Sequence, residues 1–233
     1  MVNPLPARLA WLPALALAAA CGGQEPGPAA QGTPLVATLA QAAAAQGTAE
    51  LRAGQLSQAR ATFEASLKAD PDRMGALNDL AVTYYLEGRF EAARQLLDEV
   101  VAKGAAPEQQ AALVNLAELY ALDGYLSAAQ AHLESARGID ATRAEPVYAL
   151  ALLADGRGDP DAARLARDAV RLDPDGAARR SLAFVYAEEK SHLDALLAEV
   201  AGDRALAAAR WRELRAGRFP ALAVSAARHL EEP

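Results

Sequence analysis

Residues 80–94 read Leu80-Ala81-Val82-Thr83-Tyr84-Tyr85-Leu86-Glu87-Gly88-Arg89-Phe90-Glu91-Ala92-Ala93-Arg94. Gly88 separates two stretches that are rich in helix-forming residues. The same arrangement recurs around Gly54, Gly124 and Gly158, so that the four glycines are spaced 34, 36 and 34 residues apart. Self-similarity at a period of this size is typical of repeat proteins, in which each unit buries its apolar face against the next.

The composition favours helices throughout the chain. Of the 233 residues, 52% are apolar but only 5% are aromatic, so alanine and leucine supply most of the apolar content. β-branched residues are sparse, and no segment alternates with a period of two. The single cysteine allows no disulfide within the chain, so stability has to come from helix packing. The sequence therefore predicts an all-α fold.

The repeated pattern resembles the tetratricopeptide repeat, in which a glycine joins two antiparallel helices and proline follows the second helix. Leu-Ala-x-x-Tyr precedes the glycine at residues 80–84 and 116–120, and Asp-Pro occurs at residues 70–71 and 173–174. The resemblance implies a right-handed α-solenoid of about six helix hairpins. Its units are expected at about residues 40–73, 74–107, 110–143, 144–175, 176–202 and 203–233, although Lys190 replaces the glycine of the fifth unit.

Small residues occur where the two helices of each hairpin are expected to come closest. Only a small side chain fits at such a crossing, because a larger one forces the surrounding core to shift. The first helices carry Gly47, Ala81, Ala117, Ala151 and Ala183 at this position, and the second helices carry Ala59, Ala93, Ala129, Ala163 and Ala195. We expect all of them to lie in the core.

The N-terminus has the features of a targeting segment. Arg8 precedes a short apolar run that ends at Cys21, and the run is shorter than the ~20 residues that a bilayer-spanning helix needs. Leu17-Ala18-Ala19-Ala20-Cys21 resembles the lipobox of bacterial lipoproteins, although Ala18 stands where leucine or valine is usual. The resemblance implies a signal peptide over residues 1–20, lipidation of Cys21 by acyl chains such as palmitate, and a flexible tether over residues 21–33.

The lipobox also implies a location in the cell. Gly22 is not the aspartate that retains such lipoproteins in the inner membrane, so we expect an anchor in the outer membrane of a bacterial envelope, facing the periplasm. The alternative is ordinary signal cleavage near Ala20, which would leave Cys21 as a free thiol.

In the repeat family, the first helix of each unit lines a concave groove that binds peptide segments. Carried over position by position, the groove lining would comprise Asn78, Asp79, Val82, Tyr85, Val114, Asn115, Glu118, Tyr148, Leu152, Phe184 and Trp211. The asparagines are expected to hydrogen-bond an extended peptide backbone, and the aromatic side chains to act as apolar anchors. The alternative is that the aromatic side chains pack between units and the asparagines are solvated.

Residues typical of catalysis, metal binding or nucleic-acid binding do not cluster in the sequence. His132, His192 and His229 lack the spacing of metal ligands, and no glycine-rich phosphate loop is present. The formal charge is −7, and cleavage before Cys21 would remove Arg8 and make it −8, which disfavours nucleic-acid binding. We therefore expect no enzymatic activity, no cofactor and no metal.

These features favour a membrane-tethered scaffold that binds a segment of another envelope protein and assists its assembly or placement. The architecture resembles that of the tandem-repeat lipoproteins that serve secretin assembly in type IV pilus biogenesis. The alternative is an accessory lipoprotein of a cell-wall enzyme system that binds a small ligand or a glycan. For that role, Tyr85 would supply an aromatic ring, with Asp79 and Glu118 as nearby carboxylates.

Overall fold

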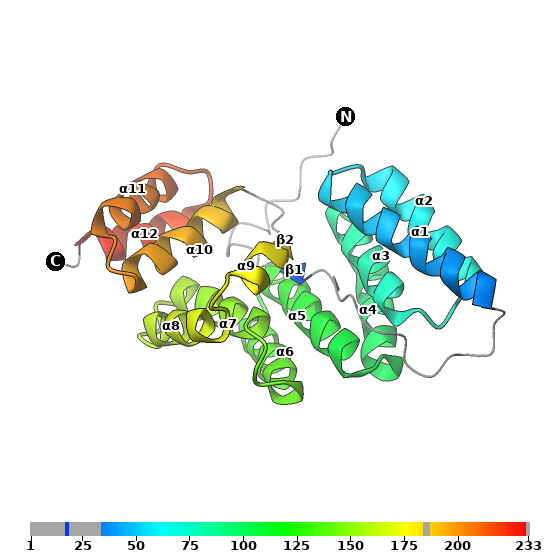
Figure 1. The fold of residues 1–233 in the computed structure, drawn as a ribbon. Helices are drawn as coiled ribbons and strands as arrows, with labels where there is room; N and C mark the ends of the chain where they lie inside the picture. Colours follow the sequence, from blue (N-terminus) through cyan, green and yellow to red (C-terminus); the bar gives the residue numbers. More distant parts are fainter. Residues whose placement is uncertain (1–16, 19–33, 184–186, 232–233) are drawn as a thin grey trace. The chain divides into compact units, whose positions relative to one another are not determined.

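The computed structural model describes residues 17–18, 34–183 and 187–231, and most of them are helical (Figure 1). The helices are α1 Pro34–Arg52, α2 Leu56–Ala69, α3 Met74–Leu86, α4 Phe90–Lys103, α5 Ala106–Leu122, α6 Leu126–Ile139, α7 Glu145–Gly156, α8 Ala162–Leu172, α9 Ala177–Ser181, α10 Ala187–Val200, α11 Arg204–Arg215 and α12 Pro220–Glu231. Two extended segments, β1 (Leu17–Ala18) and β2 (Leu182–Ala183), have two residues each. The expectation of an all-α fold is confirmed. Within the described ranges, no helix combines the length and the hydropathy that a membrane span requires.

The chain divides into two compact units, and the boundary falls inside α5, between Leu116 and Ala117. In the first unit, α1 packs against α2, α2 against α3, and α3 against α4. In the second unit, α7 packs against α6 and α8, α11 packs against α10 and α12, and α10 also contacts α8. Within each unit, packing therefore runs mainly between neighbours along the chain, as expected for stacked helix pairs.

A glycine in the left-handed region ends the first helix of a hairpin. Gly54 has a φ of 72°, and its N–H donates to the carbonyl of Leu51. The next N–H, that of Gln55, donates to the carbonyl of Glu50. These two bonds satisfy carbonyls at the helix end, and glycine adopts the required φ without steric cost. The same pair of bonds recurs at three further turn glycines, Gly88, Gly124 and Gly158, so the predicted turns are confirmed.

A fifth turn of this kind, which was not predicted from the sequence, joins α10 to α11. Gly202 has a φ of 79°, and the N–H groups of Gly202 and Asp203 donate to the carbonyls of Glu199 and Ala198. The Asp203 carboxylate then caps α11 by accepting the N–H of Leu206 at 3.0 Å. The signal was present in the sequence, because a glycine precedes an N-capping aspartate at the expected end of a helix.

The first helix expected in the fifth unit is only partly formed. α9 ends at Ser181, and Leu182 is extended, with φ −66° and ψ 127°. The prediction that Ala183 lies at a helix crossing is therefore wrong, since this residue belongs to β2. Residues 182–186 read Leu-Ala-Phe-Val-Tyr, and phenylalanine, valine and tyrosine are residue types that are enriched in strands. Phe184 lies outside the described residues.

Close helix crossings confirm most of the predicted small positions. A Cβ atom added at Gly47 in α1 would stand 2.7 Å from the ring of Phe63 in α2, and Phe63 is itself fully buried. The alanines with no exposed surface include Ala59, Ala81, Ala93, Ala117, Ala129, Ala151 and Ala195. A methyl group is therefore the largest side chain that most of these crossings hold.

α8 differs from the other second helices in its register. In α2, α4 and α6, the buried residues follow the turn glycine by 5, 9 and 12 positions, as at Ala59, Phe63 and Ser66. In α8, Ala162, Ala166 and Ala169 are buried instead, at 4, 8 and 11 positions after the glycine. The prediction that Ala163 occupies the crossing is therefore wrong by one residue. The Asp-Pro-Asp turn replaces the first helical turn, since α8 starts four residues after its glycine and α2, α4 and α6 start two residues after theirs, and the register changes with it.

Replacing Gly47 tests the closest crossing. Gly47→Ala places a methyl group against the buried Phe63 ring, so we expect a loss of about 1–2 kcal/mol and a fall in melting temperature of about 2–4 °C per kcal/mol. The matched control is Gly75→Ala in α3, where an added Cβ meets no atom within 4 Å. This variant should be neutral or slightly stabilising. Equal melting temperatures for the two variants would contradict the close crossing.

Candidate functional site

Polar side chains, buried except for the half-buried Thr48, connect α1, α3 and α5 in the first unit. The Nδ2 of Asn115 donates to the Oδ1 of Asn78 at 2.9 Å. The Nδ2 of Asn78 donates in turn to Asp79 at 3.3 Å, and the hydroxyl of Thr48 donates to the other Asp79 oxygen at 2.9 Å. We call these four residues the polar row. It links three helices that each come first in a hairpin.

Asn78 retains hydrogen-bonding capacity within this row. Its amide has two N–H groups and an oxygen with two lone pairs, and the row uses one of each. Burying polar groups in a helical core is costly unless they are paired, and apolar side chains of similar size would pack there without that requirement. The two amides and the carboxylate are paired with one another at these positions, so the row helps to fix the register of the helices that it joins.

The predicted groove positions of the first unit lie together on α3 and α5. Val82, Tyr85 and Val114 accompany the polar row, and these three residues are buried within this chain, as are Asn78, Asp79 and Asn115. The Tyr85 ring lies 5.5 Å from the ring of Phe90, at an angle of 57°. Glu118, which lies beyond the unit boundary on α5, is buried as well. Contact between these residues and a partner stays a prediction.

Tyr148 and Leu152 of the second unit are buried on α7. The Tyr148 hydroxyl donates to Asp173 at 3.1 Å, and the same carboxylate accepts the N–H groups of Ala178 and Arg179 at 2.9 Å. Burial, reinforced by the charge of Asp173, raises the pKa of Tyr148 above its ordinary value. Tyr148 therefore ties α7 to the start of α9.

Trp211 packs inside the second unit. Its side chain is 1% exposed and stacks on the His229 imidazole, with ring centroids 4.1 Å apart and planes 3° apart. This burial follows from the register of α11, whose buried face is formed by Ala207, Trp211 and Leu214 at helical spacing, against α10 and α12. Contact between Trp211 and a partner stays a prediction, as it does for the equally buried groove positions of α3 and α5.

A buried charged cluster, which was also not predicted from the sequence, lies beside Trp211. The carboxylate of Asp155, at the end of α7, is hydrogen-bonded to three side chains: His192 at 2.6 Å, Ser225 at 2.6 Å and His229 at 2.7 Å. Arg228 donates to the backbone carbonyl of Asp155 at 2.6 Å. We call this set the Asp155 cluster. It connects α7, α10 and α12.

The charges of the cluster follow from its hydrogen bonds. Both nitrogens of His229 face carboxylates, Asp155 at 2.7 Å and Glu199 at 3.0 Å, and only the protonated imidazole donates from both. Burial disfavours that charge, but the bonds to Asp155 and Glu199 outweigh it and raise the pKa of His229 to about 9. Burial also acts to raise the pKa of Asp155, yet its hydrogen bonds to His192, His229 and Ser225 hold that pKa well below the ordinary value.

The Asp155 cluster joins its helices through contacts between imidazole and carboxylate groups. The Nε2 of His192 and both nitrogens of His229 contact carboxylates directly, and in the described part of the chain no group of three or more His, Cys, Asp or Glu residues is arranged to hold a metal ion. The histidines follow Asp155 by 37 and 74 residues, so no local spacing indicated their contact.

The pH dependence of stability tests the cluster. The pKa of His229 is about 9 in the folded protein and ~6.5 in an unfolded chain, so its stabilisation is complete below about pH 6.5 and is lost as the pH rises towards 9. We expect the melting temperature of the wild-type protein to fall across this interval by several degrees, at about 2–4 °C per kcal/mol. The His229→Gln variant should have a lower melting temperature than the wild-type protein at about pH 6.5, and its melting temperature should change little between these pH values. If the melting temperature of the variant falls with pH as steeply as that of the wild-type protein, the assignment is contradicted.

Comparisons with known proteins agree with this architecture. Residues 44–107, which extend from within α1 to just past α4, match the family model described as a tetratricopeptide repeat. The crystal structure of the APC/C hetero-tetramer Cut9–Hcn1 is similar with a TM-score of 0.58 and 16% identity, over 77% of this chain and 35% of the matched chain. This chain thus spans about a third of that protein. A thermophilic tetratricopeptide-repeat protein from Thermus thermophilus is similar with a TM-score of 0.55 and 21% identity, over 82% of this chain and 98% of the other.

These similarities define the fold as an all-α solenoid of the tetratricopeptide type. The pilF protein of Pseudomonas aeruginosa is also similar, with 18% identity over 86% of this chain and 100% of the other, but its TM-score of 0.41 is too low to carry a functional argument. No curated protein matches the chain at the level of sequence.

Proposed function

We propose that this chain is a scaffold that holds a segment of another envelope protein against the first-helix face, defined as Asn78, Asp79, Val82, Tyr85, Val114 and Asn115. In this way it would assist the assembly or placement of the bound protein. Solenoids of paired helices present extended surfaces and typically act by binding proteins. The observation that carries the proposal is the hydrogen-bonded pair of amides, Asn78 and Asn115, on consecutive first helices.

Amide side chains suit the recognition of an extended peptide. A peptide backbone offers alternating N–H and C=O groups, and an asparagine amide pairs with both. The row uses one donor and one acceptor of Asn78, whose side chain is 0% exposed, so a bound backbone would reach the amide only by displacing the groups that cover it. Tyr85 and Val82, which follow on the same helix and are 4% and 1% exposed, would supply apolar contact beside these polar groups.

Substitution on this face tests the proposal. Affinity purification from the native membranes should recover an envelope protein with the wild-type chain. Tyr85→Ala combined with Asn115→Ala should reduce that recovery about tenfold, corresponding to a loss of about 1.4 kcal/mol in binding. The control is Tyr125→Ala, which removes a ring that is 62% exposed and lies outside the first-helix face. Unchanged recovery by the double variant, with its helical circular dichroism intact, would contradict the proposal.

We propose further that lipidated Cys21 anchors the scaffold to the outer membrane. The lipobox-like residues 17–21 and the glycine- and proline-rich residues 22–32 support this proposal, and all but residues 17–18 lie outside the described part of the structure. Two or more acyl chains suffice for stable anchoring, at about 0.8 kcal/mol per buried CH₂. This combination of a lipobox, a short tether and tandem repeats suits a protein that helps to place a membrane complex such as a pilus secretin.

Cell fractionation tests the anchor. Cys21→Ala removes the only lipidation site of the proposed kind, so the variant should move from the membrane fraction to the soluble fraction. The control is Gly22→Ala, which leaves the cysteine in place and should stay with the membranes. If Cys21→Ala sediments with membranes as the wild-type protein does, lipidation is not what holds the protein there.

A further inference from the structure

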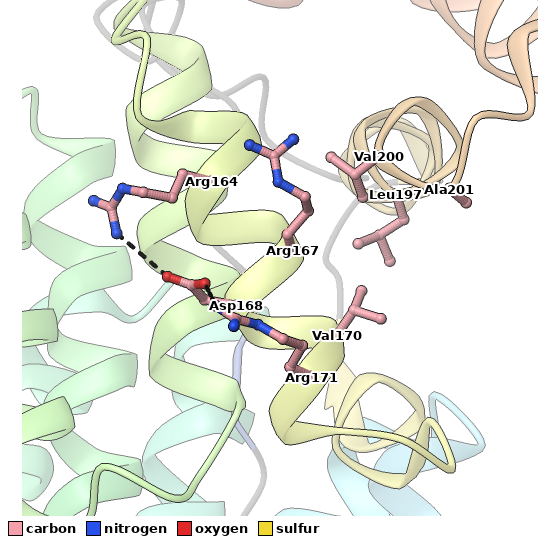
Figure 2. A pocket seen from close by; sticks show the side chains of 8 residues that line it. All are labelled: Arg164, Arg167, Asp168, Val170, Arg171, Leu197, Val200 and Ala201. Carbon is pink, nitrogen blue, oxygen red and sulfur yellow. Dashed lines mark hydrogen bonds and ion pairs between the residues drawn. The ribbon is translucent and has the colours of Figure 1, made fainter.

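A cavity of about 490 Å³ lies between α8 and α10 in the second unit (Figure 2). One wall comes from α8, with Arg164, Arg167, Asp168, Val170 and Arg171, and the other comes from α10 and the residue after it, with Leu197, Val200 and Ala201. Its volume falls within the range of about 300–1,000 Å³ that is typical of ligand sites. Neither helix belongs to the first-helix face.

The cavity is cationic although the chain is acidic. Its lining carries three arginines and one aspartate, whereas the whole chain has a formal charge of −7. The Asp168 carboxylate is shared by Arg164, at 3.3 Å, and Arg171, while Arg164 also pairs with Asp161 at 2.9 Å. These two guanidinium groups are therefore largely neutralised within the chain.

Arg167 differs from its two neighbours. In the described part of the chain, it makes no hydrogen bond or ion pair, and Figure 2 shows its side chain on the side of α8 that faces α10. Val170, one turn further along α8, is 43% exposed, and Leu197, Val200 and Ala201 form the apolar wall opposite. A cation without a partner thus stands beside exposed aliphatic surface.

We propose that this cavity binds an acidic segment of a protein partner in which Asp or Glu is adjacent to Leu, Ile or Val. Arg167 would receive the carboxylate through its planar guanidinium, and Val170, Val200 and Leu197 would receive the aliphatic side chain. A phosphate dianion suits the site less well, because the Asp168 carboxylate lies in the lining and two of the arginines are already paired with it. The site is independent of the proposed binding at the first-helix face.

The experiment uses the detergent-solubilised full chain and a fluorescein-labelled peptide of alternating leucine and glutamate, with fluorescence anisotropy as the readout. We expect saturable binding that weakens as salt is added, because the guanidinium–carboxylate contact is exposed. A peptide with glutamine in place of glutamate should bind at least about tenfold more weakly, a loss of about 1.4 kcal/mol. Equal binding of the two peptides, or no saturation up to about 1 mM, would overturn the proposal.

Variants localise the binding. Arg167→Glu should weaken binding of the acidic peptide at least about tenfold, and Val170→Gln should weaken it several-fold. The matched control is Arg212→Glu, which makes the same charge change at an exposed arginine of α11 that has no ion pair within the described residues. Equal effects of the two Arg→Glu changes would show nonspecific charge attraction and overturn the proposal.

Two further measurements separate this site from other interpretations. Tyr85→Ala with Asn115→Ala should leave peptide binding unchanged, so a failure of the proposed groove function does not affect this result. Decanoate, a carboxylate on an aliphatic chain, serves as a competitor. Unlabelled peptide and decanoate are each added to compete with the labelled peptide. If decanoate displaces the labelled peptide at lower concentrations than the unlabelled peptide does, the cavity is a site for a small amphiphile, and the proposal of a protein segment is overturned.

Discussion

The close approach of paired helices is the constraint on which the rest of this structure depends. At Gly47 a single added carbon would reach within 2.7 Å of the buried Phe63 ring, and alanines without exposed surface occupy most of the other crossings. Larger side chains there would push the helices apart, because protein cores are packed to the density of organic crystals. Helix separation in turn decides which polar side chains reach each other, such as Thr48 of α1 and Asp79 of α3.

Each unit contains a network of mostly buried polar side chains. The two networks compensate in different ways for the loss of solvation. The polar row joins neutral amides to a carboxylate across consecutive first helices. The Asp155 cluster instead neutralises a buried carboxylate with a protonated imidazole and further donors, which ties α12 to α7. Removing one partner of such a network leaves the buried polar groups of the others unpaired. Networks of this kind therefore fix the register of the helices that they connect.

The two proposed binding surfaces arise from helices with contrasting exposure. α3 is buried over most of its surface, and its polar groups already bond within the chain. α8 buries only Ala162, Leu165, Ala166 and Ala169, which leaves Arg164, Arg167 and Arg171 exposed at positions that share one side of the helix. The one-residue change of register in α8 thus determines which residues face α10. The first surface favours backbone hydrogen bonding, and the second favours a carboxylate beside an aliphatic group.

The sequence by itself determined the features that depend on local geometry. Gly54, Gly88, Gly124 and Gly158 required left-handed turns, and the small residues at fixed distances from them required close crossings, so hairpins and their order were predictable. Tertiary structure alone decided the contacts of Asp155 with His192 and His229, the burial of Trp211 and the exposure of Arg167. The cluster contacts join residues 37 and 74 positions apart, and helix periodicity does not specify which of several apolar faces meets a neighbour. Those outcomes depend on how whole helices pack, since a side chain's surroundings are set by partners that are distant in the chain.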